Sequence, residues 1–147
     1  MLIPSKAAAL VASGVFLAVA AGNEAANAET SSPASEPTVC TVGATDINDK
    51  FAVFSNFGSK VDINAPGVNI TSTWNNGGIR TISGTSMASP HIAGLGAYLL
   101  GLGSAQVDSV CETIVGLATE DVIDKATLKK GTVNLLAFNG AEGGYSR

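Results

Sequence analysis

Apolar residues recur along the chain in short blocks separated by small or polar residues. The blocks at 15–20 and 39–45 are apolar and bounded by turn residues, which predicts two buried strands of a parallel sheet. Residues 79–83 are rich in β-branched side chains and predict another strand. Residues 87–102 are apolar on nearly every side of a helix, so this helix is expected to be buried all round. Abundant glycine and alanine with few aromatic residues suit tightly packed α/β layers.

The remaining stretches complete this pattern. Ser13-Gly14 is a helix-ending pair, so a helix is expected just before the strand at 15–20. Residues 106–117 predict an amphipathic helix. Residues 25–36 and 74–78 predict surface loops, and 121–130 a charged connection. Residues 51–69 carry turn signals at 56–58 and 65–67 between short apolar pieces.

Length and charge narrow the function classes. The 147 residues favour a single domain, which we expect to be monomeric. The net charge of −4 is spread along the chain and gives no reason to expect nucleic-acid or membrane-surface binding. No apolar run reaches the roughly 18 residues that a membrane span requires.

Ser86 lies where the predicted strand at 79–83 gives way to a helix. A hydroxyl there sits beside free backbone N–H groups and the positive end of the helix dipole, which favour developing negative charge. A nucleophilic serine is one interpretation. A helix-capping serine is the other, and the local sequence alone favours it.

The octet 84–91 reads Gly-Thr-Ser-Met-Ala-Ser-Pro-His, and its length decides between these two interpretations. It closely resembles the nucleophile segment of subtilisin-like serine proteases, and its flanking residues resemble the proteinase K branch. The resemblance extends over residues 10–139 and implies the C-terminal half of a three-layer α/β fold with a mostly parallel sheet. It also implies hydrolysis of protein or peptide substrates through an acyl-enzyme on Ser86. The whole chain, 1–147, is thus expected to be one partial peptidase domain with an atypical start at 1–9.

The same resemblance shows that a histidine base is missing before Ser86. In subtilisin the triad runs Asp, His, Ser, yet no histidine precedes Ser86. The single histidine, His91, follows five positions later, about 140° around a helix axis, and is expected to be structural. The base and its aspartate would come from sequence outside this chain. The alternative is a catalytically inactive, secreted fragment that acts only as a binding or antigenic protein.

A lipase-type α/β-hydrolase is a further rival, because the Gly-x-Ser-x-Ala sequence at 84–88 is close to its nucleophile elbow. That family needs its histidine last, after an acid. His91 precedes Asp108, Asp121 and Asp124, so this rival is rejected.

The resemblance also assigns residues around the expected oxyanion. Asn23 matches the asparagine whose side-chain amide donates to the oxyanion of the tetrahedral intermediate. A neutral donor suits this role, because it stabilises charge without a proton transfer. The small residues Ala20, Ala21 and Gly22 would form one wall of the primary specificity pocket. By itself, an Asn after Gly is better explained by a turn.

Cys40 and Cys111 are the two cysteines, and their number leaves two buried thiols as likely an outcome as a bridge. The proteinase K branch has bridged cysteines at both matching positions, which implies a disulfide here and an extracellular setting. Asn69-Ile70-Thr71 is an acceptor sequence for N-glycosylation, although such triplets often arise by chance.

Pro37, Val39 and Asp62 match a calcium site of the same branch, in which two backbone carbonyls and one carboxylate hold the ion. Ligation by oxygen alone suits calcium. Without the resemblance, Asp62 would be read as a solvated turn residue.

The N-terminal residues 1–21 have two interpretations. A basic start, an apolar stretch and Ala18-Val19-Ala20 imitate a signal peptide. Residues 10–23 also resemble an internal helix–strand unit of the protease, and we prefer this internal interpretation.

Overall fold

A five-stranded sheet forms the centre of the computed structural model, which describes residues 3–141, with side chains from residue 6 onward. The strand order is β1-β2-β3-β7-β6. The parallel strands are β1 (Ala18–Ala20), β2 (Cys40–Thr45), β3 (Ile63–Pro66) and β7 (Leu135–Leu136). The edge strand β6 (Thr119–Glu120) runs antiparallel to β7. The predicted α/β fold with a mostly parallel sheet is confirmed.

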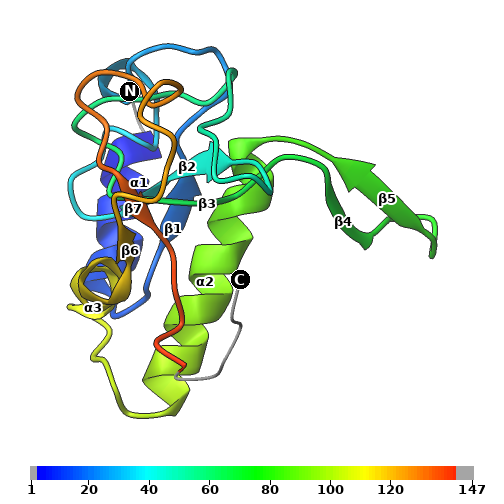
Figure 1. Cartoon of the computed structure of the whole chain (residues 1–147). Coiled ribbons are helices and arrows are strands. Elements are labelled where there is room, and N and C mark those ends of the chain that lie inside the picture. The colour runs from blue at the N-terminus through cyan, green and yellow to red at the C-terminus, as the bar shows by residue number, and fades with distance from the viewer. Residues whose placement is uncertain (1–2, 142–147) are drawn as a thin grey trace.

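Helices cover both faces of this sheet, as Figure 1 shows. On one face, α2 (Thr85–Gly101) and α3 (Val110–Leu117) pack with Val42 and Ile63 in the main hydrophobic core. On the other face, α1 (Ile3–Ala12) packs against Val19 in a smaller cluster. Ala18 belongs to the main core and its neighbour Val19 to the smaller one, because successive side chains of a strand point to opposite faces.

The helix α2 is buried on only one side, so the expectation of burial all round is wrong for this chain. Its buried positions, Ala88, Ile92, Gly96 and Leu99, recur every three or four residues and face the sheet. Tyr98, on another side of the helix, is 47% exposed. The helix lies on one face of one sheet, and none of the described residues covers its outer side.

Several boundaries differ from those predicted. The strand predicted at 15–20 begins only at Ala18, and Val15 is 42% exposed, because the partner strand β2 starts at Cys40, opposite Ala18. The helix predicted at 106–117 begins at Val110, after a turn. Two other expectations are confirmed. All six residues of β2 are buried, and Gly14, with a φ of +88°, follows α1 in the left-handed conformation that favours glycine.

The predicted strand before Ser86 belongs to a separate hairpin. Strand β5 (Ile79–Ile82) pairs antiparallel with β4 (Ile70–Thr73), and the hairpin projects from the body of the molecule in Figure 1. The Arg80 guanidinium lies 4.7 Å from the centre of the Trp74 ring, a cation–π contact near the exposed turn.

The segment at 25–36, predicted to be a surface loop, is partly buried and partly helical. It contains a short 3-10 helix, η1 (Ala28–Thr30), and buries Ala28 and Ala34 against Val61. Within the described chain, the helices are too short or too polar to cross a membrane.

Candidate active site

Ser86 lies in the first turn of α2 and is exposed. The chain enters this helix from the hairpin through the buried Gly84, whose N–H donates to the Gly67 carbonyl at 2.8 Å. In the first turn the N–H of Met87 donates to the Gly84 carbonyl at 2.9 Å, whereas the N–H of Ser86 has no acceptor among the described residues, and the helix dipole makes this end positive. The hydroxyl of Ser86 is therefore accessible and close to groups that can stabilise an anion.

The side chain of Asn23 is held against the residue before Ser86. Its Oδ1 accepts hydrogen bonds from the backbone N–H of Thr85 at 2.8 Å and from the Thr85 hydroxyl at 2.9 Å. Because a backbone N–H can only donate, the oxygen of the amide must face Thr85. The NH₂ group of Asn23 consequently points away from Thr85, and Asn23 is exposed. The amide is thus oriented as a donor beside the first turn of α2.

Thr85 is a site residue that the sequence analysis did not identify. It is fully buried, and its hydroxyl oxygen also accepts the N–H of Gly22 at 3.2 Å. One side chain therefore joins the segment that follows β1 to the start of α2. Its place in the octet is visible in the sequence, but its partners, more than 60 residues away, are not.

Asn56 is the second residue whose role was missed, since the sequence analysis treated it only as part of a turn signal at 56–58. Its side chain is fully buried and binds the segment that carries Asn23. The Asn56 Oδ1 accepts the N–H groups of Glu24 at 3.0 Å and Ala26 at 2.9 Å, and the Nδ2 donates to the Ala21 carbonyl at 3.0 Å. These bonds replace the regular pairing that the chain loses where β1 ends.

The three residues predicted to line the specificity pocket differ in exposure. Ala21 is fully buried with Ala28 and Val61, whereas Ala20 and Gly22 are half-buried. Gly22 has a φ of +109°, and a Cβ there would clash with the Asn56 side chain. Only glycine therefore suits this position, and Ala20 and Gly22 are the members of the set with surface to offer a ligand.

A surface cavity of about 410 Å³ opens beside Ser86, between the hairpin and the first turns of α2. Met87, Pro90 and His91 line its helix side, and Ile82 and Arg80 lie on the hairpin side. His91 shares this cavity with Ser86, but its Nδ1 lies 2.8 Å from the carbonyl oxygen of Met87, one turn back on the same helix. Among the described residues no hydrogen bond joins His91 to Ser86.

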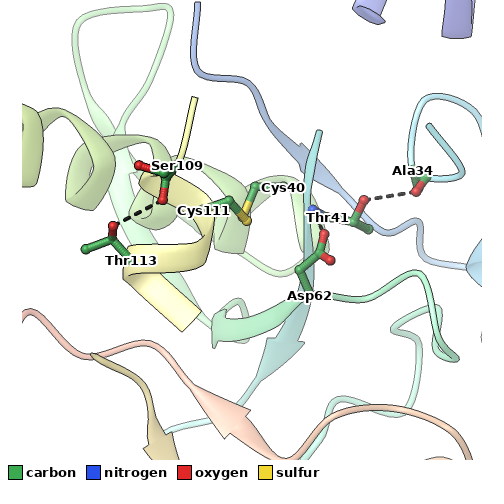
Figure 2. The surroundings of a disulfide bond; sticks show 7 residues. All are labelled: Ala34, Cys40, Thr41, Asp62, Ser109, Cys111 and Thr113. Atoms are coloured by element: carbon green, nitrogen blue, oxygen red, sulfur yellow. Dashed lines mark hydrogen bonds between the residues drawn. A yellow bond between two sulfur atoms is a disulfide. The ribbon is translucent and has the colours of Figure 1, made fainter. Parts of the chain in front are cut away.

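The predicted disulfide between Cys40 and Cys111 is confirmed, with a Cα–Cα distance of 5.8 Å. It joins β2 to α3, and Figure 2 shows Asp62 close to it. One carboxylate oxygen of Asp62 accepts the N–H of Thr41 at 2.7 Å. Burial raises the pKa of Asp62 above its usual value, while the Thr41 hydrogen bond and the positive charge of Lys60 act in the opposite direction.

Asp62 is also the side chain that could hold a metal ion. Its oxygen lies within 4.8 Å of the sulfurs of Cys40 and Cys111, but these are bonded to each other and offer no thiolate. Backbone oxygens are the remaining donors, and the backbone of Asp62 pairs with Thr41, two residues beyond Val39. The carboxylate therefore lies near the start of β2, which Pro37 and Val39 precede in the chain.

Comparisons with known proteins agree with this architecture. A profile of the subtilase family, Peptidase_S8, matches residues 4–134. The chain is 60% identical over 135 residues to "Alkaline serine protease ver112" of Corniculantispora psalliotae, covering 92% of this chain and 35% of that protein. It is 57% identical over 134 residues to "Proteinase T" of Parengyodontium album, covering 91% of this chain and 45% of that protein.

A solved structure shows the same relation. The crystal structure of a cold-adapted subtilisin-like serine proteinase superimposes with a TM-score of 0.86 at 41% identity, covering 94% of this chain and 50% of that one. The chain thus spans between about a third and a half of the length of these proteins.

Proposed function

Because the chain belongs to the subtilase family, in its proteinase K-like group, we propose that it is the nucleophile-bearing portion of a secreted serine endopeptidase. In this proposal Ser86 attacks the carbonyl carbon of a peptide bond and becomes acylated, and water then releases the acyl group. The aspartate and the histidine base are supplied by sequence outside residues 1–147. Substrates are proteins or peptides.

One observation carries the proposal: the pairing of Asn23 with Thr85. It orients the Asn23 amide as a donor beside the first turn of α2, where Ser86 presents both its hydroxyl and its backbone N–H. Two donors aimed at the developing oxyanion stabilise the tetrahedral intermediate without reorganising during the reaction. Ala20 and Gly22 would receive the substrate side chain, and the burial of Ala21 leaves these two as the accessible members of the set.

A second function is favoured by a separate observation. His91 is the chain's one histidine, and its ring already faces the Met87 carbonyl, so the described residues offer Ser86 no base. Residues 1–147 alone would then act only as a binding or antigenic protein. Hydrolysis by the chain alone, compared with hydrolysis by the chain with its missing partner, separates the two functions.

The test is complementation. The chain is refolded with the segment of the ver112 protease that precedes the matched region, and casein hydrolysis is measured for each part and for the mixture. We expect activity only in the mixture, and we expect Ser86→Ala to abolish it while Ser89→Ala, one turn further along α2, leaves it in place. A mixture that forms a complex yet remains inactive would favour the binding protein. Casein hydrolysis by the chain alone that survives Ser86→Ala would contradict both proposals.

The outer side of α2 is the surface that this partner segment would cover. It carries the small residues Ala93, Gly94 and Ala97, all exposed, which allow close approach of another element. The relatives are two to three times as long as the region they share with this chain, so they contain sequence that could supply such a segment.

The calcium site and the extracellular location are further parts of the proposal. Pro37 and Val39 would contribute backbone carbonyls and Asp62 its carboxylate, and the ion would neutralise a charge that burial disfavours. Calcium here would stabilise the fold and take no part in the chemistry. The disulfide between Cys40 and Cys111 supports secretion, because such bonds persist in oxidising compartments.

A further inference from the structure

The triplet Asn69-Ile70-Thr71 lies at the start of β4, and its sequence pattern is explained neither by the pairing of that strand nor by the proposed catalysis. It matches the acceptor pattern for N-linked glycans, Asn-x-Ser/Thr with a residue other than proline in the middle. No other asparagine of the chain is followed two positions later by serine or threonine. The triplet alone is weak evidence, so its value depends on where the structure places it.

Asn69 lies in an exposed turn between β3 and the hairpin strand β4. Its φ of +55° is in the left-handed region, which asparagine tolerates better than most residues, and its N–H donates to the Ser83 hydroxyl at 2.8 Å. Among the described residues no hydrogen bond holds its side-chain amide. The acceptor nitrogen is therefore on the surface, on a backbone that is itself fixed.

The hydroxyl that completes the acceptor pattern is also accessible. Thr71 is exposed on β4, and its Oγ1 lies 2.7 Å from the Oγ1 of Thr81 on the paired strand. The triplet thus lies where the chain enters strand β4 of the projecting hairpin (Figure 1).

We propose that Asn69 carries an N-linked glycan. The Nδ2 of Asn69 would attack the anomeric carbon of a lipid-pyrophosphate-linked oligosaccharide. A C–N bond forms as the C–O bond to pyrophosphate breaks. The lipid pyrophosphate leaves with the electron pair of that bond and takes up the proton lost by the amide, and nothing is oxidised or reduced. The inference rests on the secreted location in the proposed function, because this transfer takes place in the secretory pathway.

The surroundings of Asn69 show what a glycan would do there. Asn69 lines a surface cavity of about 530 Å³ whose other walls include the apolar residues Ile47, Val68 and Leu136. Ile47 is 94% exposed. In the described part of the chain, β4 pairs only with β5, so its outer edge is open, and open strand edges and exposed apolar patches promote association. A bulky, polar glycan at this point would cover both features.

The experiment is expression of residues 1–147 in yeast behind a cleavable secretion leader, which makes entry into the secretory pathway independent of the proposed location. Protein from cells and medium is treated with peptide-N-glycosidase and compared by electrophoresis. We expect a downward shift in apparent mass. Asn69→Asp, which tolerates the same turn, should lose the shift, and Thr71→Ser should keep it. Asn75→Gln, an asparagine of the same hairpin outside any acceptor triplet, should also keep it.

Two outcomes would overturn the inference: wild-type protein without a shift, or a shift that survives Asn69→Asp. Either would leave the proposed catalysis untouched, since complementation with the ver112 segment tests that separately. Light scattering of the secreted proteins tests the shielding role. We expect Asn69→Asp to aggregate faster than Thr71→Ser, and equal rates would refute shielding.

Discussion

Removal of the Cys40–Cys111 bridge gives the most quantitative test of this structure. The two cysteines are 71 residues apart, and the bridge joins a strand in the centre of the sheet to α3. In the chain-entropy model, opening a loop of this size increases the entropy of the unfolded chain and so lowers the free energy of unfolding by about 4.4 kcal/mol at 25 °C. The unfolding entropy of a chain of 147 residues is about 0.3 kcal/mol/K. Dividing the free-energy loss by this entropy gives a decrease of about 14 °C in Tm.

Two comparisons separate the bridge from the sulfur atoms. Oxidised and reduced wild type contain the same heavy atoms, so their difference in unfolding free energy reports the cross-link alone. The Cys40→Ala, Cys111→Ala double variant adds a packing defect, because Cys40 is only 1% exposed and lies in the main core. The double variant should therefore be slightly less stable than reduced wild type, and a reductant should not affect it.

Urea unfolding followed by circular dichroism measures these differences. The oxidised protein should also show a smaller m-value, because a cross-linked unfolded chain exposes less surface. A difference below about 1 kcal/mol between oxidised and reduced wild type would refute the entropic reasoning. Recovery of both cysteines as free thiols from folded, oxidised protein would refute the bridge itself.

Three further predictions concern the residues around the site. Asn56→Ala should lower the unfolding free energy by about 3 kcal/mol or more, because it leaves the Ala21 carbonyl and two N–H groups unpaired; a loss below about 1 kcal/mol in urea unfolding would argue against this network. In the complemented enzyme, Thr85→Val should lower kcat about tenfold, equal to about 1.4 kcal/mol, with KM unchanged, because Asn23 loses one of its two hydrogen bonds to Thr85. Thr85→Ser should restore kcat. An equal loss of kcat in both variants would contradict a positioning role. Calcium at a hundred times its Kd should raise the unfolding free energy by about 2.7 kcal/mol, and Asp62→Asn should remove this gain. With a chelator present, wild type should lose stability as pH rises from the usual aspartate pKa through the raised pKa of Asp62, because ionisation of Asp62 is disfavoured in the folded state. Asp62→Asn should show no such loss. Melting curves that do not respond to calcium in either protein would exclude the site.

The sequence by itself determined the features that depend on local pattern. The continuous apolar block at 39–45 predicts a strand with both faces buried, and β2 is such a strand. Ser13-Gly14 predicts the end of a helix, and the octet at 84–91 predicts a helix that begins beside Ser86; both are present. The resemblance carried by that octet also indicated the family, which the profile match confirms.

Tertiary structure alone decided how distant segments meet. Asn56 binds Glu24 across 32 positions and Thr85 binds Asn23 across 62, and neither pair has a spacing that local periodicity can report. The burial of α2 was overestimated for the same reason, since an apolar helix shows that a surface needs cover but not whether the chain provides it. The spacing of apolar residues along the chain reports the local backbone conformation. The contacts of each side chain depend on sheet register and helix packing, which bring distant segments together.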